Sequence, residues 1–274
     1  MSQHDFPSTL MPNLGNPIGM KFNPERWEPT VMVDVLDPEL GPVLEALRSW
    51  SEGGDPPARN LFFSYVLTVP HVVLLCGVPK GGAETVLRRI AEWRQAGTFI
   101  IWLVPPSAFR DFDDIECSGG EKSELICAAD ATVLVQRLLV PSLSQAASDC
   151  WTVVRAARGL VYELVFYGLV GIDFADIKYV LAASDKRPLV HYSLTSQSEV
   201  PPSDWWPAPF ASRRFSQCMV ASIMPVQDDM LPKFDSFIGE MLSCGDQDAE
   251  YMTTLGFDKS GENFEAEVYV RFSK

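Results

Sequence analysis

A short glycine-rich segment with one lysine, Gly77-Val-Pro-Lys-Gly-Gly82, has residue types that could bind a phosphate group. It lies between an expected strand and an expected helix, which is the context in which glycine N–H groups and a lysine hold phosphate oxygens. The Gly-Lys-Ser/Thr ending of such loops is absent, and Glu84 would repel phosphate close to the lysine. Gly77, Lys80, Gly81 and Gly82 therefore favour a structural strand-to-helix turn over a working phosphate site.

Two carboxylates three residues apart, Asp173 and Asp176, lie in the segment Gly168-Leu-Val-Gly-Ile-Asp-Phe-Ala-Asp-Ile-Lys178. Taken alone, they are typical of a solvent-exposed loop and of a helix cap, because Asp is favoured just before a helix begins. A third candidate is the segment Asp204-Trp-Trp-Pro-Ala-Pro-Phe210. Trp205 and Trp206 predict either a packed loop anchor or a protein-binding surface, since Trp is enriched in interface hot spots.

The composition excludes several classes of protein. Apolar residues make up 47% of the 274 residues and charged residues 21%, as in a globular protein with a sizeable core. The net charge of -14 argues against a nucleic-acid partner, which needs a basic surface. The six cysteines form no C-x-x-C pair and the three histidines are scattered, so we expect neither a disulfide framework nor a metal. We see no signal peptide or membrane-spanning stretch and expect a cytoplasmic protein without direct membrane insertion.

The elements around these residues alternate between strand and helix. Short, continuous, β-branched-rich runs predict buried strands at 31–36, 72–76, 98–104 and 131–135. Helices are expected at 37–50, where an Asp-Pro-Glu start follows the first strand, and at 84–95. Strands that are apolar throughout, with helices between them, are typical of a parallel sheet covered on both faces.

The second half is expected to begin with one long helix over 142–167, whose adjacent apolar rows indicate burial between two bodies. A helix at 174–182 and a strand at 188–193 follow. The pattern then predicts a strand at 214–224, a helix at 230–242, and strands at 250–258 and 263–272 that form a hairpin through the turn at 259–262.

The segment Gly168–Lys178 resembles the synergy loop of the FtsZ/tubulin family, G-L-[IV]-N-[LV]-D-F-A-D-[VI]-K. In that family, this loop enters the nucleotide pocket of the next subunit, where its acidic side chains position the hydrolytic water. The resemblance therefore identifies Asp173 and Asp176 as a partner-binding remnant of this loop. Gly171 stands where the family has Asn, so one polar contact of the loop is missing.

The resemblance is collinear over roughly residues 71–274. Val72–Arg89 is similar to the strand, phosphate loop and helix of the family, Ala131–Leu139 to the strand that ends in N-D-R-L-L, and Ser142–Leu164 to its central helix. The phosphate loop differs most, because the family has G-G-G-T-G-T-G. Here Gly77–Gly82 is shorter, and Pro79 lacks the N–H that a cradle of amides needs.

We therefore predict an α/β fold: a truncated tubulin/FtsZ-like parallel sheet domain, a central helix, and a smaller α+β C-terminal domain. The expected divisions are an irregular N-terminal arm (1–30), a truncated remnant of the nucleotide domain (31–141), the central helix (142–167) and the C-terminal domain (168–274).

The predicted function is a non-catalytic, FtsZ-like pseudo-GTPase of the bacterial cytoskeleton or cell-division type. It would bind no cofactor, and would self-associate or cap or modulate an FtsZ-type filament or other assembly through Asp173 and Asp176. One alternative is a divergent GTPase that binds GTP through Gly77–Gly82 and forms polymers. Another is a scaffold subunit repurposed for an unrelated machine, with Trp205 and Trp206 at its interface.

Overall fold

One ten-stranded sheet runs through the protein, in the order β1-β9-β8-β10-β7-β6-β5-β4-β2-β3. The computed structural model describes residues 17–18, 29–53, 60–63, 69–108, 121–136, 144–165, 174–182, 187–195, 213–225, 230–258 and 264–273. The strands are β1 Pro17–Ile18, β2 Val31–Val35, β3 Leu61–Phe63, β4 Val72–Cys76, β5 Phe99–Val104, β6 Ala131–Val135, β7 Leu189–Thr195, β8 Phe215–Pro225, β9 Gly245–Asp258 and β10 Glu265–Phe272.

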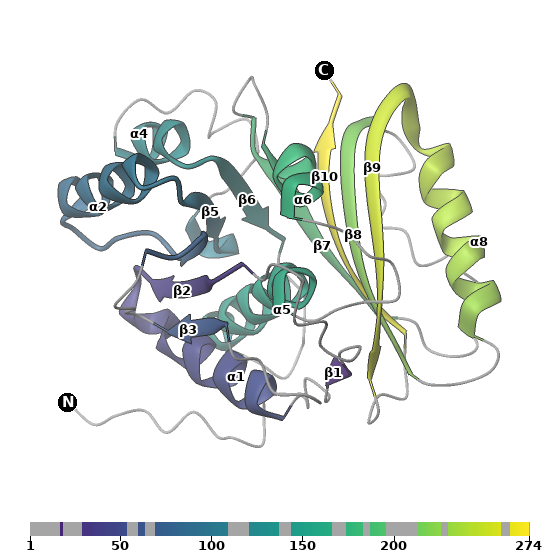
Figure 1. Cartoon of the computed structure of the whole chain (residues 1–274), viewed down its shortest axis with the longest axis horizontal. Coiled ribbons are helices and arrows are strands. Elements are labelled where there is room, and N and C mark those ends of the chain that lie inside the picture. Colours follow the sequence, from purple (N-terminus) through teal and green to yellow (C-terminus); the bar gives the residue numbers. More distant parts are fainter. Residues whose placement is uncertain are drawn as a thin grey trace.

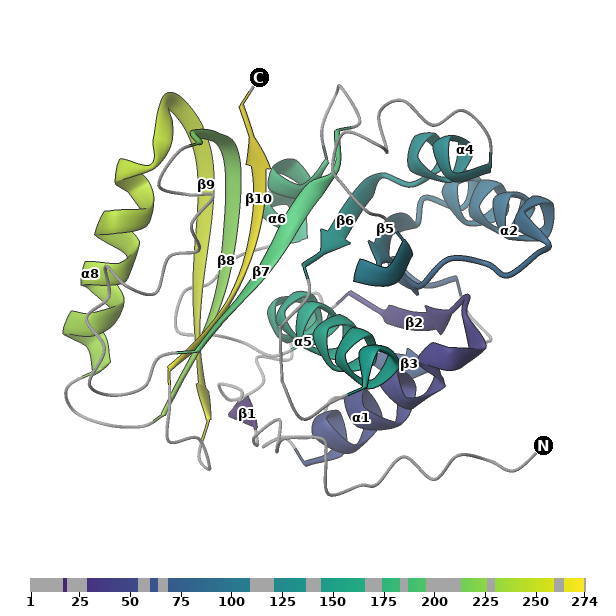
Figure 2. The same ribbon diagram turned by 180° about the vertical axis from the view of Figure 1, so that it is seen from behind.

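Helices cover both faces of this sheet (Figures 1 and 2). They are η1 Pro38–Leu40, α1 Gly41–Glu52, α2 Ala83–Gln95, η2 Pro106–Ala108, α4 Glu121–Ala128, α5 Gln145–Val165, α6 Phe174–Leu181 and α8 Met230–Ser243. Strands β3, β2, β4, β5, β6 and β7 are parallel to one another, which confirms the predicted parallel sheet.

Alternate side chains of the parallel strands enter two separate cores, because successive residues of a strand point to opposite faces. On β4, Val72 and Leu74 join the core formed with α1 and α5, whereas Val73 and Leu75 join the core formed with α2 and α4. This double burial explains why the strands are almost entirely apolar, with Asp34 of β2 and Thr132 of β6 as polar exceptions.

Helix α5 lies at the centre of the molecule, as the long apolar helix of the sequence predicted. Its side chains share one core with strands of both halves, from Val31 of β2 to Met219 of β8. Helix α8 covers the opposite face of the C-terminal strands, where Phe237 and Met241 are buried. The sheet also joins the two halves, because β7 pairs with β6 on one side and with β10 on the other.

The predicted hairpin between the last two strands is wrong. Strand β8 lies between β9 and β10, in antiparallel pairing with β10 and parallel pairing with β9. The period-two pattern located both strands but carried no information on which strand would be the neighbour of each. Strands β1 and β3 and helix α4 were not predicted, and β1 places part of the N-terminal arm against Phe257 and Asp258 of β9.

Candidate functional site

The loop between β4 and α2 contains Gly77, Lys80, Gly81 and Gly82 at the end of β4, where the sequence placed them. Gly77, Gly81 and Gly82 all have positive φ, at 94°, 108° and 71°. Glycine adopts this conformation without the steric cost of a side chain. At Gly77 a Cβ would lie 2.9 Å from Asp37 Cβ, so only glycine fits between the loop and the neighbouring segment.

The start of this loop is fixed by hydrogen bonds to β5. The indole Nε1 of Trp102 donates to the carbonyl of Gly77 over 2.7 Å, and the Gly77 N–H donates to the carbonyl of Leu103 over 2.9 Å. Trp102 is buried, so these bonds are shielded from water. The glycines with positive φ therefore belong to a turn whose first residue is fixed by hydrogen bonds to β5.

Lys80 forms two ion pairs with the segment that follows β2. Its Nζ lies 3.1 Å from Asp37 Oδ1 and 2.6 Å from Glu39 Oε1. The hydrogen bond to Glu39 raises the pKa of Lys80, and the bond to Asp37 adds to this effect. Asp37 also accepts the N–H of Glu39 and so caps η1. The lysine thus bridges two loops at the carboxyl edge of the parallel strands.

Carboxylates surround the position at which a phosphate would meet the loop. Asp37 and Glu39 flank Lys80, and Glu84 lies exposed in the first turn of α2. The N-terminus of a helix attracts anions, but negative side chains placed there compete with a ligand for that attraction. This arrangement holds the cationic side chain of Lys80 between carboxylates of its own chain.

Asp176 lies exposed in the first turn of α6, as the sequence predicted for a helix start at Phe174. Asp173, Trp205 and Trp206 lie outside the described residues, as does most of the segment Gly168–Lys178. The structure therefore brings Asp176 to the surface but does not test the rest of the predicted partner-binding loop.

Tyr179 stands beside Asp176 on α6 and is 64% exposed. Its hydroxyl donates to Oε1 of Glu250 on β9, and Oε2 of Glu250 accepts from Gln217 Nε2 over 2.7 Å. The hydrogen bond to Glu250 raises the pKa of Tyr179. No sequence signal pointed to this residue, because its partner lies 71 positions further along the chain.

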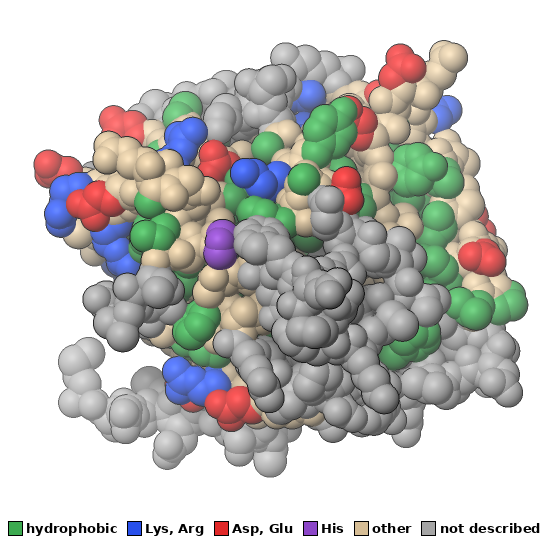
Figure 3. Space-filling view, in the orientation of Figure 1, with side chains coloured by type: hydrophobic (Ala, Val, Ile, Leu, Met, Phe, Trp, Pro, Cys, Tyr) green, Lys and Arg blue, Asp and Glu red, His purple; other side chains and the backbone are tan. Residues whose placement is uncertain are grey.

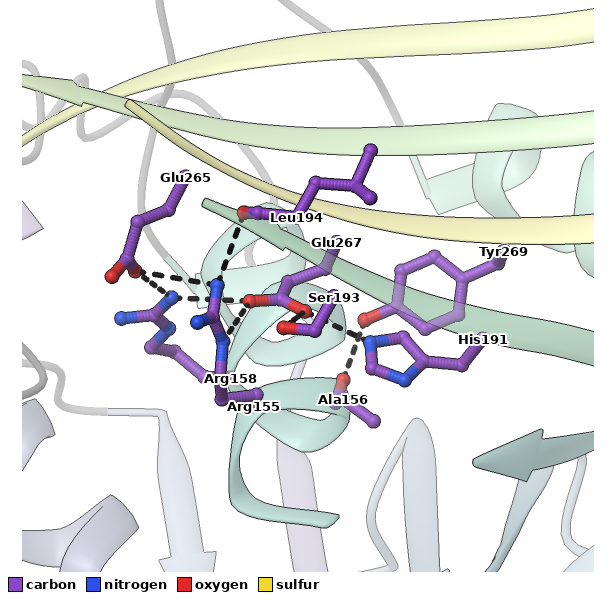
Figure 4. A network of polar contacts seen from close by, with 9 residues as sticks. All are labelled: Arg155, Ala156, Arg158, His191, Ser193, Leu194, Glu265, Glu267 and Tyr269. Atoms are coloured by element: carbon purple, nitrogen blue, oxygen red, sulfur yellow. Dashed lines mark hydrogen bonds and ion pairs between the residues drawn. The ribbon is translucent and has the colours of Figure 1, made fainter. Parts of the chain in front are cut away.

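A buried polar network joins α5 to β7 and β10 (Figure 4), and the sequence did not reveal it. Glu267 accepts from Arg155 Nε over 2.7 Å, from Arg158 over 3.2 Å and from Ser193 Oγ over 2.7 Å. The two arginines contact Oε1 of Glu267, whereas His191 Nε2 lies 2.9 Å from Oε2, the oxygen that also accepts from Ser193. The exposed fraction of Glu267 is 1%, so these contacts replace water around its carboxylate.

The electrostatics of the network keep its carboxylate charged. Burial alone would raise the pKa of Glu267, but Arg155, His191 and Arg158 outweigh it, and the pKa lies well below its usual range. Burial would lower the pKa of Arg158, and Glu265 with Glu267 outweighs that effect and raises it. Paired charges of this kind are costly to break, because removal of one partner leaves the other buried and uncompensated.

Two close approaches complete the contact of α5 with the sheet. Tyr269 Oη donates to the carbonyl of Ala156 over 2.5 Å. A Cβ on Gly159 would lie 2.5 Å from the same Tyr269 Oη, so only glycine fits at this position. Tyr162 accepts the N–H of Phe257 over 3.1 Å. The network and these bonds have a positioning role within the fold and lie away from the β4–α2 loop.

Within the described part of the chain, no group of three His, Cys, Asp or Glu residues could hold a metal ion. Burial raises the pKa of the Cys76 and Cys218 thiols, and raises that of Cys150 to about 12. These thiols are therefore protonated near neutral pH and poor nucleophiles. No helix of the described residues is long and apolar enough to cross a membrane.

The strand order, the central helix and the covering layers define a tubulin/FtsZ-like fold. The FtsZ dimer of M. jannaschii, described as empty, matches with a TM-score of 0.70 and 13% identity, over 91% of this chain and 89% of that chain. CetZ from Methanosaeta thermophila strain DSM 6194 matches with a TM-score of 0.59 and 12% identity, over 90% and 87% of the two chains. No protein-family model matches the sequence, and no curated protein matches it significantly. The likeness confirms the predicted fold.

Proposed function

We propose that this chain is a non-catalytic, FtsZ-like interaction protein that has lost GTP binding. It associates with itself or with an FtsZ-type filament through the loop that carries Asp173 and Asp176. The observation that carries the proposal is the pair of ion contacts from Lys80 to Asp37 and Glu39, which engages the lysine of the β4–α2 loop with carboxylates of its own chain.

Electrostatics support the loss of phosphate binding. A phosphate at the loop would have to displace Lys80 from two carboxylates and then lie beside them. Two unit charges of like sign 4 Å apart repel by about 1 kcal/mol in water and about 4 kcal/mol near a protein surface. Glu84 at the start of α2 adds a third negative charge. The single ammonium of Lys80 does not outweigh three carboxylates.

The backbone of the loop supports the same proposal. A phosphate cradle needs several N–H groups that converge on one point. Pro79 has no N–H, and Gly77 is packed against Asp37 with its own N–H bonded to Leu103. Two of the six positions in Gly77–Gly82 thus offer no free N–H to a phosphate where the FtsZ family has its glycine-rich cradle.

A subunit of this kind has an asymmetric role in a filament. The acidic loop at Asp173 and Asp176 would engage the next subunit, whereas the altered β4–α2 loop could not complete a nucleotide-dependent contact on the other side. The chain would therefore join a polymer end in one orientation and stop its growth. M. jannaschii FtsZ, which shares the fold, was solved as a dimer.

Affinity capture from the native cell tests the association. The D173A/D176A variant should lose its partner, because the pair forms the contact. A matched control, D235A/D248A, removes the same charge from exposed positions on α8 and β9 and should retain it. Retention by D173A/D176A would contradict the capping role and favour the repurposed scaffold, in which Trp205 and Trp206 form the interface.

Phosphate release tests the catalytic part of the proposal. The purified chain at concentrations that drive self-association should release no phosphate from GTP above the buffer rate. Release that rises with protein concentration and disappears in the D173A/D176A variant would favour the divergent polymerising GTPase.

A further inference from the structure

Helix α8 carries a second apolar row besides the one that it buries. The buried row faces the C-terminal strands and comprises Phe234, Phe237 and Met241. Leu231, Ile238 and Leu242 lie at positions i, i+7 and i+11, so they share a different face of the helix. Leu231 is 49% exposed and Leu242 37%, with the partly buried Ile238 between them. Figure 3 shows hydrophobic side chains along α8, with an acidic side chain among them. A helix that only covers a sheet needs one apolar face, so the second row indicates a binding surface.

The surface beside this row is open. Gly239 follows Ile238, and no described residue outside its own helix has an atom within 4 Å of the position that a Cβ on Gly239 would take. Glycine in the middle of a helix is unfavourable relative to alanine, and no described contact requires it here. Its lack of a side chain lets another backbone approach α8 closely. A row that extends over about 16 Å beside such a glycine has the shape that a second helix needs.

Asp235 gives the row a negative charge. It lies four residues after Leu231 on the same face, and its side chain is exposed. Within the described part of the chain, no hydrogen bond or ion pair engages its carboxylate. Lys233 is the only cation in the sequence of α8, and it lies two positions before Asp235, on a different face. A partner that covers the row must therefore bring a cation, since a carboxylate that leaves water needs a paired charge.

We infer that α8 binds an amphipathic helix of a protein partner, with apolar side chains on the exposed row and a lysine or arginine paired with Asp235. The charge of Asp235 argues against two other occupants. In a two-fold pair of α8 helices centred on the row, the two copies of Asp235 would stand only about 5 Å apart along the helix axis, where they repel. A membrane of anionic lipids is repelled by Asp235 and by the net charge of -14.

NMR of the full chain with labelled isoleucine methyl groups tests the inference. The probe is a synthetic leucine–lysine peptide whose leucines repeat at helical spacing. The I238V and I126V variants assign two resonances, and Ile126 on α4 is the matched control because it is also partly buried on a surface helix. The Ile238 resonance should shift and saturate as peptide is added, while that of Ile126 stays in place.

Variants of α8 separate the apolar contact from the charge. L231S/L242S, with an otherwise unchanged methyl spectrum, should weaken binding by about tenfold or more, because it removes the two exposed leucines of the row. D235N should weaken binding by about two- to fivefold. D248N removes an exposed carboxylate from β9 and should leave the affinity unchanged.

Four results would overturn the inference: no shift at Ile238, equal shifts at Ile238 and Ile126, equal binding of a leucine–glutamate peptide of the same spacing, or equal affinities of D235N and D248N. Sedimentation of the chain alone tests a second copy as the occupant, and a dimer that L231S/L242S dissociates would also overturn it.

The outcome is independent of the proposed function, because α8 is separate in the sequence from the loop at Asp173 and Asp176. The D235A/D248A variant that serves as the control for the loop should keep the partner of the loop and lose that of α8. Binding of GTP by the chain would contradict the proposed function and leave the peptide result standing.

Discussion

Replacement of Glu267 by Gln should destabilise the protein strongly, because it neutralises the only fully buried carboxylate of the network in Figure 4. Arg155 and Arg158 are 4% and 2% exposed, and each has a nitrogen within 3.2 Å of Oε1 of Glu267. Among the residues drawn in Figure 4, Glu265 would be the remaining anion beside the two buried guanidinium groups. Loss of one partner of a buried ion pair costs about 3–5 kcal/mol.

Urea unfolding followed by tryptophan fluorescence measures this cost, since the buried Trp151 of α5 reports on the same helix. A matched variant, E124Q, removes an exposed carboxylate from α4 and should change the free energy of unfolding by less than about 0.5 kcal/mol. A loss of less than about 1 kcal/mol for E267Q, with the slope of the urea transition unchanged, would refute the assignment of a paired, ionised carboxylate.

The pH dependence of stability follows from the same carboxylate. The pKa of Glu267 is lowered on folding, so its contribution is fully present above the unfolded value of about 4.3 and is lost as pH falls towards the folded value. Wild-type stability should therefore fall below about pH 5 more steeply than that of E267Q. Parallel pH profiles for the two proteins would contradict the low pKa.

Further predictions concern packing, the loop scaffold and the thiols. The G159A variant should lose about 1–3 kcal/mol in urea unfolding, because its Cβ would lie 2.5 Å from the hydroxyl of Tyr269; a change near zero would show that the helix can move away. The W102F variant should lose about 1–3 kcal/mol, because it leaves the buried carbonyl at the start of the β4–α2 loop without its indole donor, and an unchanged midpoint would contradict that contact. Alkylation by iodoacetamide at pH 8, followed by peptide mass spectrometry, should modify the exposed Cys127 well before the buried Cys150, whose pKa is raised to about 12; equal rates would contradict that burial.

The parallel sheet could be predicted from the sequence because each of its strands is a short apolar run of its own. Residues 72–76 and 131–135 were located without error, since double burial makes them apolar apart from Thr132. The short strand β3, with three residues, has no detectable period. Helix α4 was missed for a related reason, because its apolar residues do not gather on one face.

The buried polar network and the ion pairs of Lys80 could not be predicted from the sequence, because each joins residues of different elements. Arg155 and Glu267 are 112 residues apart, so their types gave no sign that they meet. The acids that hold Lys80 are also on another element, and only the adjacent Glu84 was visible as an obstacle to phosphate. The sequence identified the glycines of the loop. It could not predict the contacts of Gly77 with Asp37 and with Leu103, because these partners lie on other elements.

The proposed function depends on a β4–α2 loop that does not bind GTP. Calorimetric titration of GTP with Mg²⁺ into the purified chain measures this binding, with K80A as a companion variant that removes the ion pairs to Asp37 and Glu39. Heats no larger than those of dilution are expected for both proteins. Micromolar binding by the wild-type chain that is lost in K80A would contradict the proposed function, because Lys80 would then hold a phosphate instead of its own carboxylates.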